Sequence, residues 1–126
     1  MADMLEQASA WLGRMRADHM GRKVTYRRGQ QYVEVTASVG NTVFEVINDS
    51  GFAELVHSRD YLIAADTLVI SGTAVIPKPG DRIEELLNGQ TLVHDVMSPD
   101  QGKPCWRYSD PYRRTIRIHT KQTEVN

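Results

Sequence analysis

The stretches KVTYRR (residues 23–28) and YVEVTASV (residues 32–39) alternate apolar and polar side chains with a period of two. Val24 and Tyr26 share one side of the first stretch, and Val35 belongs to the apolar side of the second. Successive side chains of a β-strand point to opposite faces, so this period indicates strands with one buried face. The two stretches predict a pair of half-buried antiparallel strands.

The stretch DRIEELLNGQTLVHDV (residues 81–96) predicts a β-hairpin further along the chain. Its centre, Asn88-Gly89, suits the two-residue turn in which both central residues need a positive φ. One face of the first strand of this hairpin is expected to carry Ile83, Glu85 and Leu87. The positions across from them on the second strand are expected to be Leu92, His94 and Val96.

The rest of the chain continues in the same style. Further strands are predicted at residues 42–49, 51–58, 105–109 and 115–121, and residues 59–72 are predicted to form a turn that leads into a strand. In the last strand, Ile116 and Ile118 are expected to point inward. About eight short strands at a spacing of roughly 8 to 12 residues are typical of a small barrel or sandwich. The sequence predicts a mainly β fold, a small antiparallel β-barrel or sandwich.

One segment departs from the β pattern. Between residues 3 and 20, Met4, Ala8, Trp11 and Met15 recur at steps of four, three and four, which indicates an amphipathic helix. Its apolar stripe is expected to pack on the body of the same domain or, alternatively, on a neighbouring subunit. A chain of 126 residues suits a single domain. The division predicted for it is a helix at 3–20, a β-barrel at 23–122 and a tail at 123–126.

Composition limits the function classes. The chain has 15 Lys and Arg against 16 Asp and Glu, a formal charge of -1, which is unlike a dedicated nucleic-acid-binding domain. A single cysteine excludes an internal disulfide and is consistent with a reducing compartment. No apolar run approaches the roughly 20 residues that cross a bilayer, and acids precede any apolar stretch at the N-terminus, unlike a signal peptide. A soluble protein without a membrane partner is expected.

No pattern of residues predicts catalysis or a cofactor. The four histidines lie far apart and lack the spacing of metal ligands; they are His19, His57, His94 and His119. Cys105 has no CxxC partner and lies beside Trp106, a setting that favours packing over reactivity. There is no nucleophile motif and no phosphate-binding glycine loop. The expectation is a protein that is not an enzyme and holds no cofactor or metal.

Cations gather near the C-terminus. By strand alternation Arg117, His119 and Lys121 are expected to share the outward face of the last strand, with Arg113 and Arg114 at its entry. Arg107 lies on the preceding strand. Three interpretations stay open: phosphate contact without base readout, a solvated strand face, or half of a subunit interface.

An acidic stretch could supply the other half of that interface. Asp81, Glu84 and Glu85 lie at and beside the start of the predicted hairpin. We expect them to be exposed, where acids protect a hairpin from pairing edge to edge with another chain.

The order of several short runs resembles a known group of proteins. These runs are Arg59-Asp60-Tyr61-Leu62-Ile63, Pro79-Gly80-Asp81-Arg82-Ile83, and Arg117-Ile118-His119-Thr120-Lys121. Over about residues 20 to 122 the chain resembles the small phage and prophage head-tail joining proteins, which include the lambda-type stopper protein. None of the shared runs is a catalytic motif, so Arg59, Asp60, Tyr61, Pro79, Gly80 and Asp81 are assigned a structural role. The helix at 3–20 departs from the lambda-type pattern, and its role is not carried over.

The resemblance implies a structural subunit of the phage neck. Such a subunit is a β-barrel that assembles as a ring, commonly a hexamer, beneath the portal and its adaptor, where it closes the filled head and docks the tail. A free subunit is expected to be monomeric, because these proteins often need the preceding ring as a template. The expected location is the virion neck, and the host cytoplasm during assembly. Two alternatives remain: a tail-terminator or tail-completion protein, and a sequence-independent DNA-binding β-barrel.

Overall fold

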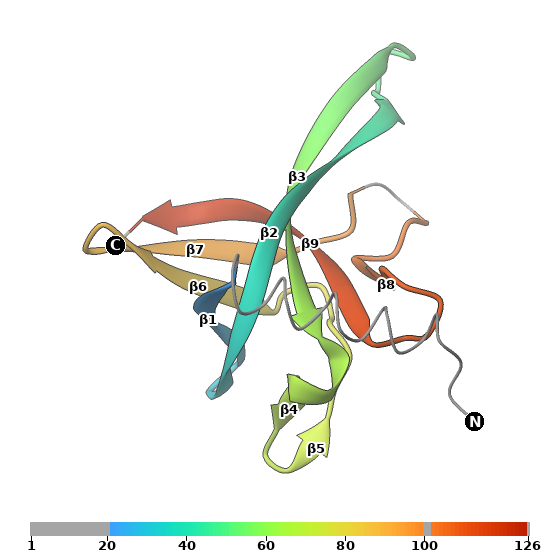
Figure 1. Ribbon diagram of the computed structural model, residues 1–126. Coiled ribbons are helices and arrows are strands. Elements are labelled where there is room, and N and C mark those ends of the chain that lie inside the picture. Colours follow the sequence, from blue (N-terminus) through green and yellow to red (C-terminus); the bar gives the residue numbers. More distant parts are fainter. Residues whose placement is uncertain (1–20, 100–101, 126) are drawn as a thin grey trace.

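The computed structural model describes residues 21–99 and 102–125, and the helix predicted at 3–20 lies outside these residues (Figure 1). The described part contains nine β-strands and one short 3-10 helix, η1. Their bounds are β1 (Arg22–Arg28), β2 (Gln31–Ile47), β3 (Ala53–Ala64), η1 (Ala65–Thr67), β4 (Val69–Ile70), β5 (Thr73–Ala74), β6 (Arg82–Leu87), β7 (Gln90–Val96), β8 (Trp106–Tyr108) and β9 (Thr115–Val125).

Six of these strands close into a barrel. They pair in the order β3-β2-β1-β6-β7-β9, and β9 also pairs with β3, so that the sheet returns to its first strand. Every pairing is antiparallel. The short strand β8 pairs with β9 outside this ring of strands, and β4 and β5 form a separate ribbon. The structure confirms the predicted mainly β fold and shows that it is a barrel.

The barrel is filled by the apolar side of each strand. Val24 and Tyr26 of β1 are buried against Ile83 of β6, as the period of two requires. Ile116 and Ile118 of β9 are buried as predicted. The other buried apolar residues of this core are Val35, Ala37, Tyr61, Ile63, Leu68, Ile70, Val96 and Cys105. One core therefore lies inside the closed sheet.

The predicted hairpin turn is present between β6 and β7. Asn88 has a φ of 53° and Gly89 a φ of 79°, the left-handed values that this two-residue turn needs. The turn sets the register in which Leu87 faces Gln90 and Ile83 faces His94. Ile83 and Glu85 of the predicted face are buried, whereas Leu87 is exposed.

Three boundaries differ from the sequence prediction. The two strands predicted around residues 32–39 and 42–49 form one continuous strand, β2, which passes through Gly40. Residues 59–64 of the predicted turn segment belong to β3, and the turn itself is η1, followed by β4. The last strand, predicted at residues 115–121, continues to Val125 in β9 and pairs with β7 there.

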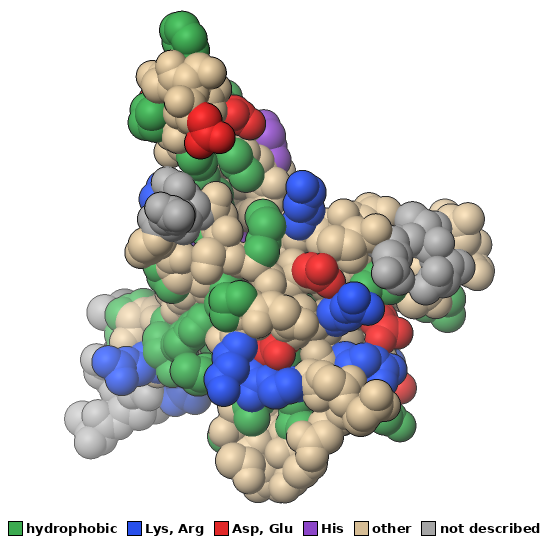
Figure 2. Space-filling view, turned by 180° about the vertical axis from the view of Figure 1, so that it is seen from behind, with side chains coloured by type: hydrophobic (Ala, Val, Ile, Leu, Met, Phe, Trp, Pro, Cys, Tyr) green, Lys and Arg blue, Asp and Glu red, His purple; other side chains and the backbone are tan. Residues whose placement is uncertain are grey.

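The long β2–β3 hairpin extends beyond the barrel. β2 pairs with β1 only as far as Ala37, and β3 pairs with β9 only from Arg59 onward. Between these limits the two strands pair only with each other among the described residues, from Asn41 to the turn and back. We call residues 41–58 the hairpin arm. It projects from the barrel in Figure 1, and Figure 2 shows hydrophobic and acidic side chains along it.

Candidate assembly surfaces

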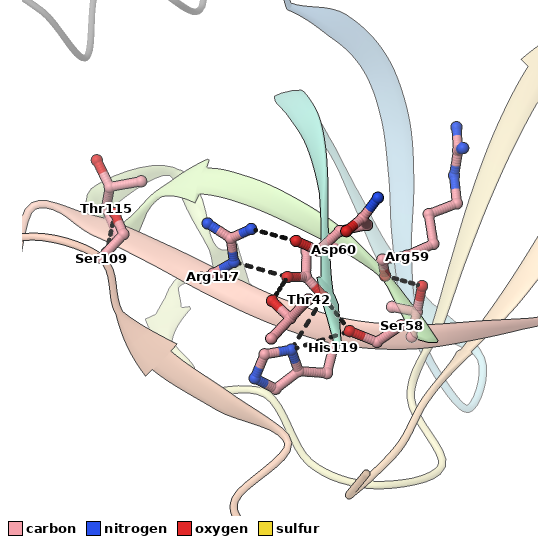
Figure 3. A network of polar contacts seen from close by, with 10 residues as sticks. Thr42, Ser58, Arg59, Asp60, Ser109, Thr115, Arg117 and His119 are labelled. Atoms are coloured by element: carbon pink, nitrogen blue, oxygen red, sulfur yellow. Dashed lines mark hydrogen bonds and ion pairs between the residues drawn. The ribbon is translucent and has the colours of Figure 1, made fainter. Parts of the chain in front are cut away.

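Asp60 forms the centre of a polar network at the seam where the barrel closes. β3 and β9 meet there with Asp60 opposite His119. Arg117 Nε donates to the Asp60 carboxylate at 2.6 Å, His119 Nδ1 lies 2.9 Å from it, and Ser58 Oγ donates at 2.6 Å (Figure 3). The hydroxyl of Thr42 donates to the same carboxylate. The network thus joins β2, β3 and β9.

This network holds Asp60 as an anion although its side chain is fully buried. Burial would raise the pKa of Asp60, but hydrogen bonds from His119, Ser58, Thr42 and Arg117 outweigh it and hold the pKa well below its usual range. A buried ionised carboxylate that accepts several hydrogen bonds holds together the strands that supply the donors.

The network corrects the prediction of a single outward basic stripe. Arg117 is only 20% exposed and His119 only 4%, because both side chains turn to Asp60. Phe44 from the arm covers His119 in an edge-on contact, with the ring centroids 5.0 Å apart. The ammonium group of Lys103 in turn lies over the Phe44 ring, 5.2 Å from its centroid. Strand alternation placed both residues on the outer face correctly, but it could not show that the arm and the loop before β8 cover this face.

A second network lies inside the barrel around Glu85, whose side chain is 1% exposed. Its carboxylate accepts from Arg22 at 2.6 Å, from Arg59 at 2.9 Å and from the Tyr61 hydroxyl at 2.8 Å. Burial would raise the pKa of Glu85, but these hydrogen bonds lower it to about 2. Nδ1 of His94 lies 3.0 Å from the same tyrosine hydroxyl. Since that hydroxyl donates to Glu85, we infer that His94 Nδ1 carries a proton and donates to the hydroxyl oxygen.

A third network surrounds Asp81 and explains the turn before it. The Asp81 carboxylate accepts from the Tyr26 hydroxyl, from Arg28 at 2.8 Å and from the backbone N–H of Lys78 at 3.0 Å. Gly80, with a φ of 95°, lets the chain reverse so that the Asp81 N–H donates back to the Lys78 carbonyl. Burial would raise the pKa of Asp81, but Arg28 and Tyr26 lower it.

These two networks correct the predicted acidic surface. Asp81 and Glu85 are buried, so they are not the exposed edge charges that we expected. Glu84 is half-buried and pairs with Arg27 on the neighbouring strand β1. The acids predicted as one half of an interface are instead paired with arginines of the same chain.

Part of the predicted basic stripe does remain at the surface. Arg107, Arg113 and Arg114 are exposed in the segment from β8 to the start of β9, and Lys121 is exposed further along β9. Asp110 shapes this segment, because its Oδ1 accepts from the backbone N–H groups of Arg114 and Thr115. We call residues 106–114 the basic turn.

The basic turn also carries aromatic rings. Trp106 and Tyr108 are half-buried and contact each other edge-on at 5.0 Å. The Arg113 guanidinium lies over the Tyr108 ring at 5.7 Å, with Arg113 in the left-handed region at a φ of 59°. The basic turn therefore presents arginines beside aromatic surface, a composition suited to contact with a partner.

A hollow of about 540 Å³ lies where the hairpin arm leaves the barrel. Its lining comes from β2, β3 and β9 and includes His57, Arg59 and Lys121. Arg59 is already bound to Glu85, and no group of three or more His, Cys, Asp or Glu residues that could hold a metal ion occurs in residues 21–99 and 102–125. The same part of the chain has no helix long and apolar enough to span a membrane.

Comparison with known families gives the class of the protein. The chain matches the family model described as phage head-tail joining protein over residues 2–126. The chain belongs to this family. A search of curated proteins finds no match.

Family membership confirms the resemblance drawn from the sequence. This head-tail joining protein is a structural component of the phage neck, and its partners are other head or tail proteins of the phage. The family is a structural one and not known as enzymatic.

Several of the residues that carried the resemblance lie in or beside the three polar networks. Arg59 and Tyr61 bind Glu85, and Asp60 holds the seam. Pro79 and Gly80 form the turn that delivers Asp81 to Tyr26 and Arg28. In this head-tail joining protein the shared residues thus link strands that lie far apart in the sequence.

The two strands of the hairpin arm were predicted, but its projection beyond the barrel was not. Its exposed apolar side chains are Val43, Ile47, Phe52 and Leu55. A signal was present, because in the run TVFEVI Val43 and Ile47 lie on one face while Phe44 and Val46 lie on the other. Apolar residues on both faces of a strand are typical of a strand that is covered on both sides. Among the described residues, the face of Phe44 is covered, whereas Val43 and Ile47 are exposed.

Proposed function

We propose that this protein is a head-tail connector subunit, a stopper or head-completion protein, which forms a ring beneath the portal and its adaptor. In this proposal the ring closes the DNA-filled head and offers a docking face to the tail. The observation that carries the proposal is the family match over residues 2–126.

The barrel is consistent with such a role. Each barrel strand is paired on both sides within the closed sheet, and charged networks fasten the pairings. A rigid barrel can present an arm and loops to several partners at once. Closed rings form from subunits that carry two different complementary surfaces.

A nonsense mutation in the gene for this chain, in the phage that encodes it, tests the proposal. Electron microscopy should show heads and separate tails of normal length, with joining restored when the intact protein is supplied. Mass spectrometry should find the chain in complete particles, and its absence from them would overturn the proposal. Tails of abnormal length in the mutant would instead indicate a tail terminator.

The exposed arginines of the basic turn favour a second candidate, sequence-independent contact with DNA. Phosphate contacts release counterions, so the binding constant should fall with salt by a slope of about 0.9 per contact on a logarithmic scale. The triple variant Arg107→Ala, Arg113→Ala, Arg114→Ala should lose this dependence, whereas Lys23→Ala, an exposed change on β1, should keep it. No binding of duplex DNA at low salt would end this candidate.

A further inference from the structure

The hairpin arm exposes large apolar side chains to solvent. The exposed fractions are 49% for Val43, 65% for Ile47, 71% for Phe52 and 64% for Leu55. Strand register places Leu55 beside Glu45 and Ala53 beside Ile47, so Val43, Ile47 and Leu55 share one face. Contiguous exposed apolar surface marks an interaction site, and a lone two-stranded ribbon is at best marginally stable in water.

The charges of the arm are all of one sign. Residues 41–58 contain Glu45, Asp49 and Glu54 but no lysine or arginine. All three acids are exposed, and none forms an ion pair with the parts of the chain that the structure describes. A surface of this sign repels DNA, so the partner of the arm is a protein surface that carries positive charge.

The basic turn has the complementary chemistry. Arg107 and Arg113 are exposed and have no ion pair among the described residues. Arg113 lies over the Tyr108 ring, and Arg107 is the residue between Trp106 and Tyr108 on β8. Arginines beside aromatic side chains can contact the apolar face of the arm and its carboxylates together.

The two surfaces point in different directions on one molecule. The arm projects away from the β8–β9 segment in Figure 1, and in Figure 2 most lysine and arginine side chains gather on the body below the arm. The tip of the arm is therefore suited to a basic turn on another molecule. Two different complementary surfaces on each copy give a head-to-tail contact, which closes into a ring when the rotation permits.

We propose that the hairpin arm of each subunit docks on the basic turn of a second copy of this chain. This inference rests on the ring proposed above and names the two surfaces that meet between neighbouring subunits. One surface consists of Val43, Ile47 and Leu55 with their flanking acids. The other consists of residues 106–114. The arm thus forms a contact between neighbouring subunits, which we call the intersubunit clasp. In this contact the arginines of the basic turn bind carboxylates of the arm instead of phosphate.

Charge reversal in phage particles tests this pairing. Glu45→Lys with Glu54→Lys, and separately Arg107→Glu with Arg113→Glu, should each reduce the yield of joined particles about tenfold or more, since like charges then face each other. The four changes together should restore most of the yield. Glu34→Lys, an exposed acid of β2 outside the arm, is the matched control and should have no effect.

Cysteine cross-linking tests the geometry independently. In a Cys105→Ser background, particles whose subunits carry both Asp49→Cys and Arg107→Cys should give a ladder of covalent oligomers on oxidation. Either cysteine alone should give none, and Asp66→Cys with Arg107→Cys is the matched control, since Asp66 is exposed outside the arm. Covalent dimers from Asp49→Cys alone would mean that two arms pair with each other, and would overturn the proposal.

The outcomes separate this inference from the proposed function. Particles that contain the chain and join normally, but show neither the charge effect nor the ladder, would overturn the clasp and leave the connector role intact. Loss of joining in the arginine variant alone, without rescue by the reversed arm, would show that the basic turn binds another partner such as DNA. Complete particles without the chain would remove the connector role itself.

Discussion

Arg117 of β9 donates from Nε to the buried carboxylate of Asp60 on β3 at 2.6 Å, across the seam at which the barrel closes. The same carboxylate accepts hydrogen bonds from the hydroxyl groups of Ser58 and Thr42 and also contacts Nδ1 of His119. The last pairing of the barrel is therefore held by one anion as well as by backbone hydrogen bonds.

Replacing this anion should destabilise the whole domain. Asp60→Asn removes the negative charge and leaves Arg117 and His119 without the buried anion that both contact. Breaking a buried ion pair by removing one partner costs about 3 to 5 kcal/mol, so we expect a loss of about 3 kcal/mol in the free energy of unfolding. Urea unfolding measures it, and the exposed Asp66→Asn serves as the control. A loss no larger than that of the control would contradict the role given to Asp60.

Acid should weaken the fold through Glu85. Its pKa is about 2 in the folded protein against an ordinary value of 4.5, so the unfolded chain takes up the proton first. The stabilisation by Glu85 is complete above about pH 4.5 and is lost as the pH falls toward about 2. Urea midpoints across this range should drop in the wild type and change less in Glu85→Gln. Glu34→Gln, an exposed change, should keep the wild-type slope, and an equal slope in all three proteins would disprove the assignment.

His94 should add a separate pH dependence at higher pH. Burial lowers its pKa below the ordinary 6.5, and the charge of Arg59 lowers it further. The folded state therefore resists protonation, and stability should decrease as the pH falls below about 6.5. His94→Gln should flatten the stability profile just below that pH, even if its overall stability is lower. His57→Gln on the exposed arm should leave the profile unchanged, and a slope that persists in His94→Gln would show that another group titrates there.

Cys105 should report opening of the core. Burial raises the pKa of its thiol, and the thiol lies 3.7 Å from the Pro77 carbonyl oxygen. The reactive thiolate is therefore both scarce and covered in the folded protein. Alkylation by iodoacetamide should be slow in buffer and should reach the rate of a free cysteine in urea above the unfolding midpoint. Rapid alkylation of the native protein would contradict the packing of Cys105.

Local patterns were sufficient for the strands and their buried faces. The alternation at Val24 and Tyr26, and at Ile116 and Ile118, predicted the side chains that fill the barrel. The Asn88-Gly89 pair predicted its turn, because few residue pairs accept two positive φ values in succession. Both signals depend only on neighbouring residues, which is why sequence reasoning could find them.

The burial and the binding partners of the charged residues could not be predicted in the same way. Alternation placed Glu85 on the same face as Ile83, but it could not show which side chains would bind its carboxylate there. These are Arg22 of the neighbouring strand β1 and Arg59 of β3, a strand that pairs elsewhere in the barrel. Likewise Arg117 lies on the outer face as predicted, but it is mostly covered because it binds Asp60 on the adjacent strand β3.

Strand identity, turn chemistry and the membership of a structural phage family could thus be inferred from the order of residues, since these depend on local sequence. Barrel closure, the burial of Asp60, Asp81 and Glu85, and the projection of the hairpin arm required the folded chain. The physical reason is that the desolvation of a charge is offset only by donors brought from distant segments, and no local pattern records which segments those are.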